Sequence, residues 1–208
     1  MPKGFKVGIM GGTFDPIHYG HLVAAEAARA EFNLQQVIFV PTGRPPHKEG
    51  LEISDAKDRL LMTTLATLTN PYFDVSRVDI DRPGLTYTID TIRDLRQIYG
   101  PEAALYFITG ADALLEILSW KDAAELVNKC QFIAASRPGY SLGQLEKALG
   151  SFFTENRRVF HLLEVPALAI SSTDIRERVR SGRPIQYLLP ETVAYYIMKN
   201  HLYIERSA

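Results

Sequence analysis

Short apolar runs that alternate with longer amphipathic stretches constrain the fold of this 208-residue chain more than any other feature. Strands that are covered on both faces are apolar without alternation, and this pattern predicts buried strands at residues 6–10, 37–40, 105–109 and 131–135. Residues 73–80 alternate more and are predicted nearer an edge, and residues 158–165 are a further candidate strand. Strands that alternate with helices form βαβ units, so the sequence predicts an α/β fold around a parallel sheet with right-handed crossovers.

Helices are predicted between these strands. Residues 21–32 are rich in alanine, the best helix former, whose small side chain permits close packing on a sheet. Two more helices are indicated by apolar residues that fall on one face. The first contains Leu61, Leu65 and Leu68. The second, over residues 88–99, contains Ile92, Leu95 and Tyr99. Further helices are predicted near residues 111–118, 122–129, 142–152, 173–181 and 190–200.

The length of the chain allows one ordinary core, and we expect a single domain over residues 1–208. The sheet and its helices are expected over residues 1–170. Residues 171–208 are expected to form a helical C-terminal part that packs beside the sheet.

The composition excludes several classes of protein. A formal net charge of −1 gives no global field for binding nucleic acid or a membrane surface, so an anion site must be local. No apolar run reaches the roughly 18 residues needed to span a bilayer. The one cysteine, Cys130, excludes an intramolecular disulfide and fits a buried thiol in a reducing compartment. We therefore expect a cytoplasmic protein without nucleic-acid or membrane partners, and the sequence leaves open whether it forms a homo-oligomer.

The stretch GGTFDPIHYGHL, residues 11–22, follows the first predicted strand, at the edge of the sheet where ligands bind in α/β folds. Three interpretations compete for it. A dinucleotide-binding turn needs G-x-G-x-x-G directly before a helix and an acid near the end of the second strand, and neither is present. A metal site would use His18 and His21, but no nearby cysteine or acidic cluster completes the ligands, and Asp15 alone is insufficient.

A phosphate cradle fits this stretch better. Gly11 and Gly12 let the backbone approach a ligand closely, and Gly20 does the same between the two imidazoles. His21 opens a predicted helix, whose free N–H groups and positive dipole end favour phosphate. Both imidazoles can donate hydrogen bonds to phosphoryl oxygens. The alternative is that the two histidines only cap or pack at a turn.

The same stretch resembles the H-x-G-H signature of a nucleotidyltransferase superfamily, and ISSTDIR at residues 170–176 resembles its second signature. Shorter segments resemble bacterial nicotinate-nucleotide adenylyltransferases, and these are PPHK (45–48), RPGLTYTIDT (82–91), GAD (110–112), SW (119–120) and SRPG (136–139). The resemblance implies a Rossmann-like, doubly wound parallel sheet with helices on both faces. It also implies transfer of the adenylyl group of ATP to nicotinate mononucleotide, which gives deamido-NAD and pyrophosphate in NAD biosynthesis.

The resemblance implies roles for particular residues. The catalytic ones would be His18, His21 and Arg176, which contact ATP phosphates and stabilise the transferring group. The residues expected to bind ATP are Gly11, Gly12, Thr13, Phe14, His18, His21, Ser172, Thr173 and Arg176, with Thr13 and Phe14 at the mouth between the nucleotides. The residues expected to bind the mononucleotide are Lys48, Thr88, Gly110, Asp112, Trp120 and Arg137. Of these, Trp120 would stack on the nicotinate ring and Thr88 would meet its carboxylate.

Alternatives stay open for several of these residues. Ser172 or Thr173 would also suit an ordinary helix N-cap, and Trp120 would suit a hydrophobic core. Displacement at the α-phosphorus by a phosphate oxygen needs no general base, so catalysis would be mainly positioning and charge neutralisation. Mg²⁺ is expected to accompany ATP, held by phosphates and water, and no protein ligand is assigned to it. Competing functions are a related adenylyltransferase for nicotinamide mononucleotide or phosphopantetheine, and a nucleotide-binding regulator without turnover.

Overall fold

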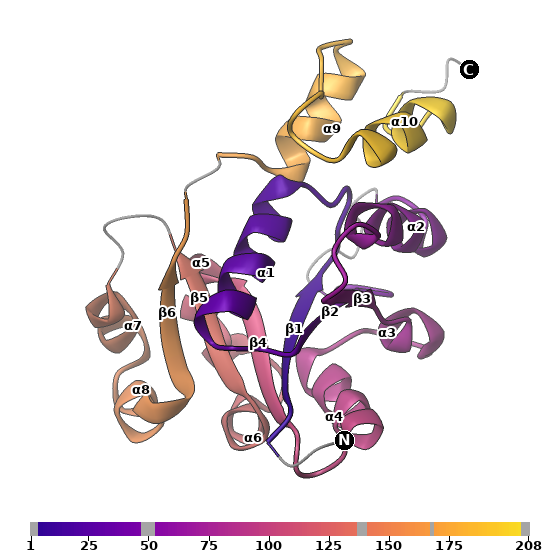
Figure 1. The fold of residues 1–208 in the computed structure, drawn as a ribbon. Helices are drawn as coiled ribbons and strands as arrows, with labels where there is room; N and C mark the ends of the chain where they lie inside the picture. Colours follow the sequence, from indigo (N-terminus) through magenta and orange to yellow (C-terminus); the bar gives the residue numbers. More distant parts are fainter. Residues whose placement is uncertain (1–3, 47–52, 137–140, 167–168, 205–208) are drawn as a thin grey trace.

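The computed structural model describes residues 4–46, 53–136, 141–166 and 169–204. Within them, one sheet of six parallel strands forms the centre of the molecule, in the order β3-β2-β1-β4-β5-β6 (Figure 1). The strands are β1 (Lys6–Gly12), β2 (Gln36–Pro41), β3 (Phe73–Val75), β4 (Ala104–Gly110), β5 (Gln131–Ser136) and β6 (Phe160–Glu164). The predicted α/β fold with a doubly wound parallel sheet is confirmed.

The strand order changes direction at β1. From β1 the chain builds outward through β2 to β3, and it then returns to place β4 on the other side of β1. Such a switch point leaves a crevice at the carboxyl ends of the two central strands, where ligands bind in open α/β sheets. Gly11 and Gly12 end β1, and Thr109 and Gly110 end β4, so these residues border the crevice.

Helices cover both faces of the sheet (Figure 1). The helices are α1 (Tyr19–Glu31), α2 (Ala56–Thr67), α3 (Val78–Asp81), α4 (Thr88–Tyr99), α5 (Ala111–Leu115), α6 (Ala123–Lys129), α7 (Leu142–Leu149), α8 (Ser151–Glu155), α9 (Ser172–Arg180) and α10 (Glu191–Lys199). Short 3₁₀ turns, Ile117–Ser119 and Arg157–Val159, follow α5 and precede β6. Helices α1, α2 and α10 pack in one hydrophobic core, and α4, α6 and α7 pack in the other.

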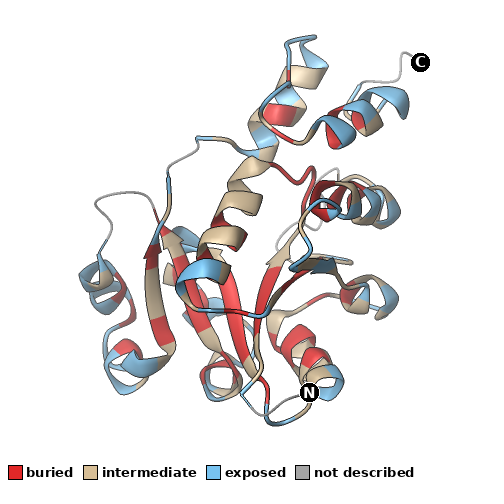
Figure 2. Cartoon of the chain, in the orientation of Figure 1, coloured by how far each residue is buried: buried red, intermediate tan, exposed pale blue. Residues whose placement is uncertain are grey.

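The two cores explain why the central strands read as unbroken apolar runs. Along β1, Val7 and Ile9 point to the core of α4 and α6, whereas Met10 points to the core of α1 and α2. Both faces of the strand are therefore removed from water, as the red colouring of the central strands in Figure 2 shows. Period-two alternation of polar residues would place polar groups in one of the cores.

The predicted strand over residues 73–80 is mostly wrong. Its first three residues form β3, which lies at the edge of the sheet as expected, but residues 78–81 form the short helix α3. The apparent alternation in this segment includes Asp79, which is buried and accepts a hydrogen bond of 2.7 Å from the Thr91 hydroxyl. From the sequence pattern alone, a polar residue that is buried against a specific partner cannot be distinguished from one on the outward face of a strand.

The predicted apolar face of α2 is only partly right, because Leu65 packs against the core but the other two leucines do not. Leu61 is 43% exposed and Leu68 is 74% exposed. The helix instead buries Arg59, Met62 and Thr63. The reason is that Arg59 satisfies its guanidinium with backbone carbonyls, so a charged residue occupies the inner face where hydrophobic periodicity expects leucine.

Helices α9 and α10 form the C-terminal part and reach back to the rest of the chain. The start of α9 lies beside the start of α1 in Figure 1. Helix α10 packs against α2, where the Tyr196 hydroxyl donates to the Asp58 carboxylate at 2.7 Å. Among the helices described, none combines the length and the apolar character that crossing a membrane requires.

Candidate active site

Two neighbouring cavities open at the carboxyl ends of the strands and share Gly11 and Thr109 in their linings. The first has a volume of about 380 Å³, and we name it the aromatic cavity after Tyr87, Phe107 and Trp120 in its wall. The second has a volume of about 640 Å³, and we name it the histidine cavity after His18 and His21. Because the cavities meet at the switch point between β1 and β4, two ligands bound in them would touch there.

The two histidines form a pair at the start of α1. His18 is the residue before the helix, and the centroids of the two rings are 3.9 Å apart. The backbone N–H of His18 donates to Nδ1 of His21 at 3.3 Å. Nδ1 of His21 is therefore the acceptor, so the ring proton of the neutral form lies on Nε2 and is free to be donated.

Gly20 permits this arrangement of the rings. A Cβ atom at Gly20 would lie 3.0 Å from both Cε1 and Nδ1 of the His18 ring. A larger residue would therefore displace the imidazole. Nδ1 of His18 is buried and has no hydrogen-bond partner among the described residues, which is a costly state in the absence of a ligand.

Burial keeps both imidazoles neutral. It lowers the pKa of His18 from its ordinary value of 6.5 to about 4. Burial also lowers the pKa of His21, and the neighbouring His18 lowers it further. At neutral pH the site therefore presents neutral hydrogen-bond donors at the N-terminus of α1, where the positive end of the helix dipole lies.

The second signature is fastened directly to the first. The Ser172 hydroxyl donates to the carbonyl oxygen of Pro16 at 2.8 Å, and Nη1 of Arg176 donates to the carbonyl oxygen of Asp15 at 2.7 Å. Ser171, rather than Ser172 or Thr173, caps α9, because its hydroxyl accepts from the N–H of Asp174 at 3.1 Å. The N-cap interpretation of Ser172 and Thr173 is thus wrong, and Ser172 instead ties the start of α9 to the histidine loop.

The Asp15 carboxylate lies buried beneath this junction. One oxygen accepts from the Tyr203 hydroxyl at 2.8 Å and the other accepts from the N–H of Ser54 at 3.3 Å. Burial raises the pKa of Tyr203, and the carboxylate of Asp15 raises it further. Sequence reasoning missed the role of Tyr203, because nothing in the residues around it marks it as a partner of the first signature.

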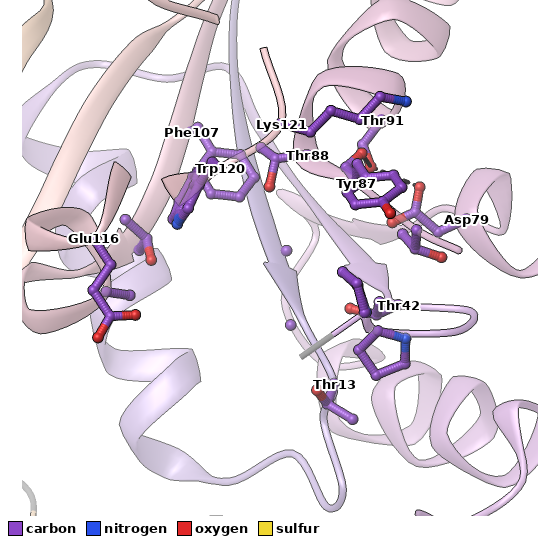
Figure 3. Close-up of a pocket in the computed structure, with 17 residues that line it drawn as sticks. Thr13, Thr42, Asp79, Tyr87, Thr88, Thr91, Phe107, Glu116, Trp120 and Lys121 are labelled. Atoms are coloured by element: carbon purple, nitrogen blue, oxygen red, sulfur yellow. Dashed lines mark hydrogen bonds between the residues drawn. The ribbon is translucent and has the colours of Figure 1, made fainter. Parts of the chain in front are cut away.

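The aromatic cavity has two opposed walls (Figure 3). On one wall, the Trp120 ring packs edge-to-face on Phe107, with ring centroids 5.8 Å apart. On the other wall lie Tyr87 and Thr88, at the start of α4. The ammonium of Lys121 lies 4.6 Å from the centroid of the Tyr87 ring and so joins the two walls at their rim. Aromatic side chains in the wall of a cavity can stack on a flat ring.

Asp79 brings a carboxyl group to the lining of the aromatic cavity. Its Oδ1 accepts from the Thr91 hydroxyl at 2.7 Å and lies 3.0 Å from Nη2 of Arg82. Burial nevertheless dominates and raises the pKa of Asp79 to about 6. The wall is therefore less negative near neutral pH than an exposed aspartate would make it.

The structure distributes the predicted site residues differently from the sequence assignment. Gly12 and Thr13, expected at ATP, line the aromatic cavity, whereas Gly110 and Asp112, expected at the mononucleotide, line the histidine cavity. Thr88 and Trp120 share the aromatic cavity, as the prediction requires. Lys48 and Arg137 lie outside the described residues, and all of these ligand assignments stay predictions.

Phe14 is buried in the turn after β1. Its side chain is only 2% exposed and packs edge-to-face on the His21 ring, with centroids 5.1 Å apart. Phe14 therefore packs against an imidazole, and its assignment to the mouth between the nucleotides stays a prediction. Its φ of +49° is uncommon for a residue with a Cβ, which marks a tightly determined turn after β1.

Comparison with known proteins places this geometry in a family. The cytidylyltransferase-like family model matches residues 9–178. The probable nicotinate-nucleotide adenylyltransferase of Moorella thermoacetica is 62% identical over 201 residues, which cover 97% of this chain and 93% of that protein. The protein of the same name from Thermoanaerobacter sp. is 59% identical, with 98% of this chain and 96% of that protein covered. The chain belongs to the nicotinate-nucleotide adenylyltransferase family.

Solved structures agree with the fold of this family. The nicotinic acid mononucleotide adenylyltransferase of Plasmodium falciparum, complexed with NaAD, superposes with a TM-score of 0.78 at 21% identity. The alignment covers 96% of this chain and 97% of that one, which confirms the Rossmann-like fold. Membership of an adenylyltransferase family also excludes the dinucleotide-turn interpretation of residues 11–22.

Proposed function

We propose that this chain transfers the adenylyl group of ATP to nicotinate mononucleotide. The observation that carries the proposal is the meeting of the aromatic cavity and the histidine cavity at Gly11 and Thr109. One cavity offers aromatic walls to a pyridine ring, and the other offers imidazoles and a helix N-terminus to phosphates. The names of the relatives at 62% and 59% identity support the same activity.

The reaction is one displacement at phosphorus. A phosphate oxygen of the mononucleotide forms a bond to the α-phosphorus of ATP, while the bond from that phosphorus to the bridging oxygen breaks. The bridging oxygen keeps the electron pair and leaves with pyrophosphate, and the other product is deamido-NAD. Since the nucleophile is already anionic, no general base is needed, and the protein contributes orientation and stabilisation of charge.

His18 and His21 would stabilise the charge on the transferring group. Nε2–H of His21 is free because Nδ1 already accepts the N–H of His18. Neutral donors fixed by burial need no rearrangement when charge develops, which is the condition for strong electrostatic catalysis. The N–H groups of the first turn of α1 would add to the same field.

Helix α9 would hold the departing phosphates. Arg176 carries its guanidinium beside the Asp15 carbonyl and the Thr173 hydroxyl, with its Nη2 donating to Thr173 Oγ1 at 3.3 Å. A guanidinium in this place can form forked hydrogen bonds to phosphate oxygens, which an ammonium cannot reproduce. Ser172 fixes the start of α9, so the helix end and the histidines keep their spacing.

Mg²⁺ would enter with ATP. In the part of the chain that the structure describes, no group of three His, Cys, Asp or Glu side chains is arranged to hold a metal ion. This agrees with an ion carried by phosphate oxygens and water, and no protein ligand is proposed. When bound, the ion neutralises phosphate charge and favours departure of pyrophosphate.

The preference for the acid over the amide would come from the start of α4. Thr88 is the first residue of this helix, and the Tyr87 side chain before it makes no capping hydrogen bond. The free N–H groups of the first turn and the Thr88 hydroxyl are donors, which suit a carboxylate better than an amide. An amide would leave one of its own N–H groups facing these donors.

We also propose that the activity is cytoplasmic. Cys130 is buried, and burial raises the pKa of its thiol to about 12, so the thiol stays protonated and has no role as a nucleophile. A single buried thiol fits a reducing compartment.

An assay of pyrophosphate release tests the proposed function. The protein is supplied with ATP and Mg²⁺ together with nicotinate mononucleotide or nicotinamide mononucleotide, and the dinucleotide product is identified by chromatography. We expect deamido-NAD and faster turnover with the acid. No turnover with either mononucleotide would contradict the proposed activity, and faster turnover with the amide would contradict the substrate assignment.

A further inference from the structure

Arg59 on α2 is a buried arginine without a carboxylate partner among the described residues. The residue is only 1% exposed, and its guanidinium donates four hydrogen bonds to backbone carbonyl oxygens. The acceptors are Thr13 at 2.8 Å, Thr42 at 2.6 Å, Gly43 at 3.0 Å and Ser54 at 3.0 Å. Burial lowers the pKa of Arg59, and the nearby carboxylates of Asp15 and Asp55 offset this cost only in part, so retention of the buried cation calls for a specific use.

These four carbonyls belong to three separate segments of the chain. Thr13 follows β1, Thr42 and Gly43 follow β2, and Ser54 precedes α2. A single nitrogen, Nη1, bridges the carbonyls of Thr13 and Thr42. Both of these residues line the aromatic cavity, whereas Arg59 itself does not. The guanidinium therefore stands behind the cavity wall and fixes the distance between two of its parts.

The same hydrogen bonds fix the direction of two peptide groups. In a trans peptide the C=O and the following N–H point in opposite directions. Since the carbonyls of Thr13 and Thr42, two residues of the cavity lining, point at Arg59, the N–H groups of Phe14 and Gly43 point away from it. Neither N–H has a hydrogen-bond acceptor among the residues that the structure describes.

The wall that carries Gly43 has no room to adjust. A Cβ atom at Gly43 would lie 2.2 Å from the carbonyl oxygen of Asp79. The hydroxyl of Thr86 accepts from the N–H of Arg44 at 3.1 Å, and the N–H of Thr86 donates to the carbonyl of Arg44 at 2.9 Å. The segment after β2 is thus clamped between Arg59 on one side and the segment before α4 on the other.

From these contacts we infer that Arg59 is a positioning residue for the mononucleotide, acting through the peptide groups of Thr13 and Thr42. It aims the N–H groups of Phe14 and Gly43 at an anionic ligand in the aromatic cavity and sets the width of the wall between them. This inference rests on the proposed function. Lysine cannot replace Arg59, because one ammonium does not span acceptors in three segments as the planar fork does.

Arg96 on α4 provides a matched control. It also donates four hydrogen bonds to backbone carbonyls, those of Gly100, Pro101, Ala103 and Lys129. These acceptors lie at the amino ends of β4 and β5, at the opposite end of the sheet from the cavities. Arg96→Lys therefore removes the same kind of structural support without touching the aromatic cavity.

Fluorescence of Trp120 gives a binding measurement that does not depend on turnover. Trp120 is the only tryptophan and lines the aromatic cavity, so titration with nicotinate mononucleotide reports the dissociation constant directly. For Arg59→Lys we expect this constant to rise about tenfold or more in protein shown by circular dichroism to be folded. For Arg96→Lys we expect a lower melting temperature and an unchanged constant.

The outcomes separate the inference from the proposed function. An unchanged constant in folded Arg59→Lys, or an equal rise in Arg96→Lys, would overturn the positioning role. Wild-type protein that binds no nicotinate mononucleotide would contradict the proposed function itself. If Arg59→Lys does not fold, amide hydrogen exchange of wild-type protein decides, since the N–H groups of Phe14 and Gly43 must become protected when the mononucleotide is added. No added protection at these amides would overturn the inference.

Discussion

The hydroxyl of Ser172 donates a hydrogen bond of 2.8 Å to the carbonyl oxygen of Pro16, across 156 residues of chain. This contact joins the start of α9 to the loop that carries the paired histidines. Arg176 adds a second contact one turn later, to the carbonyl of Asp15. Two signatures far apart in sequence are therefore joined directly by hydrogen bonds, as the proposed phosphate site requires, and the consequences can be measured.

Replacing Arg176 with lysine should lower turnover by about tenfold or more, because an ammonium cannot bind both the Asp15 carbonyl and a phosphate in forked geometry. Steady-state pyrophosphate release measures the effect. Arg180→Lys on the same helix is the control. The Arg180 side chain is 39% exposed, and its Nη1 lies as far as 4.0 Å from the carboxylate of Glu177. Equal losses in the two variants would contradict a specific role of Arg176.

The stability of the protein should fall in acid because of His18. Its pKa is about 4 in the folded state and 6.5 ordinarily, so the unfolded chain binds the extra proton as the pH falls below 6.5. Between about pH 7.5 and pH 5, this residue should remove about 2 kcal/mol from the free energy of unfolding. Comparing wild type with His18→Ala isolates the effect from Asp79, whose raised pKa of about 6 has the opposite sign.

Urea unfolding of both proteins at the two pH values makes this measurement. The free energy of unfolding of wild type, relative to that of His18→Ala, should fall as the pH is lowered. A difference independent of pH would show that His18 is accessible to protons in the folded state.

Trp120→Ala should weaken binding of nicotinate mononucleotide about tenfold and leave ATP affinity nearly unchanged, because the lost ring lines only the aromatic cavity. Isothermal titration calorimetry measures both affinities. Trp120→Phe is the matched control, since it keeps an aromatic surface against Phe107 and should retain most of the binding. Loss of folding in Trp120→Ala, with Trp120→Phe binding normally, would assign the ring mainly to the core.

Tyr203→Phe should reduce the free energy of unfolding by about 1–3 kcal/mol, because it removes a hydrogen bond from the buried Asp15 carboxylate. Tyr195→Phe is the control. Its side chain is largely exposed, with 67% of the residue accessible, so removal of its hydroxyl should change stability by less than about 0.5 kcal/mol. Denaturant unfolding monitored by circular dichroism compares the two, and equal stability of the two variants would contradict the role given to Tyr203.

The sequence predicts the sheet well because strands that are buried on both faces appear in the sequence as continuous apolar runs. The middles of β1, β2, β4 and β5 are continuous apolar runs, and their charged or amide residues, Lys6, Gln36 and Gln131, stand at the first position of a strand. Helix α2 shows the limit of the method. Hydrophobic periodicity counts leucines and omits Arg59, whose burial depends on carbonyls supplied by other segments.

The site residues divide in the same way, into those that a local sequence pattern reveals and those that only the fold reveals. His18, His21 and Ser172 are recognisable because they lie within two local signatures. Tyr203 and Arg59 are not, since each acts through a partner that only the fold brings near. Phe14 also lies within the first signature, but the sequence does not show on which side of the turn its ring lies.

The central claim is that the paired imidazoles act on the transferring group of ATP. The most direct test is the rate of deamido-NAD formation by His21→Ala at saturating ATP and nicotinate mononucleotide, with circular dichroism to verify folding. Loss of one preorganised donor should lower the rate by about 10² or more relative to wild type. A near-normal rate in folded His21→Ala would contradict the claim and would reduce the histidine pair to packing at a turn.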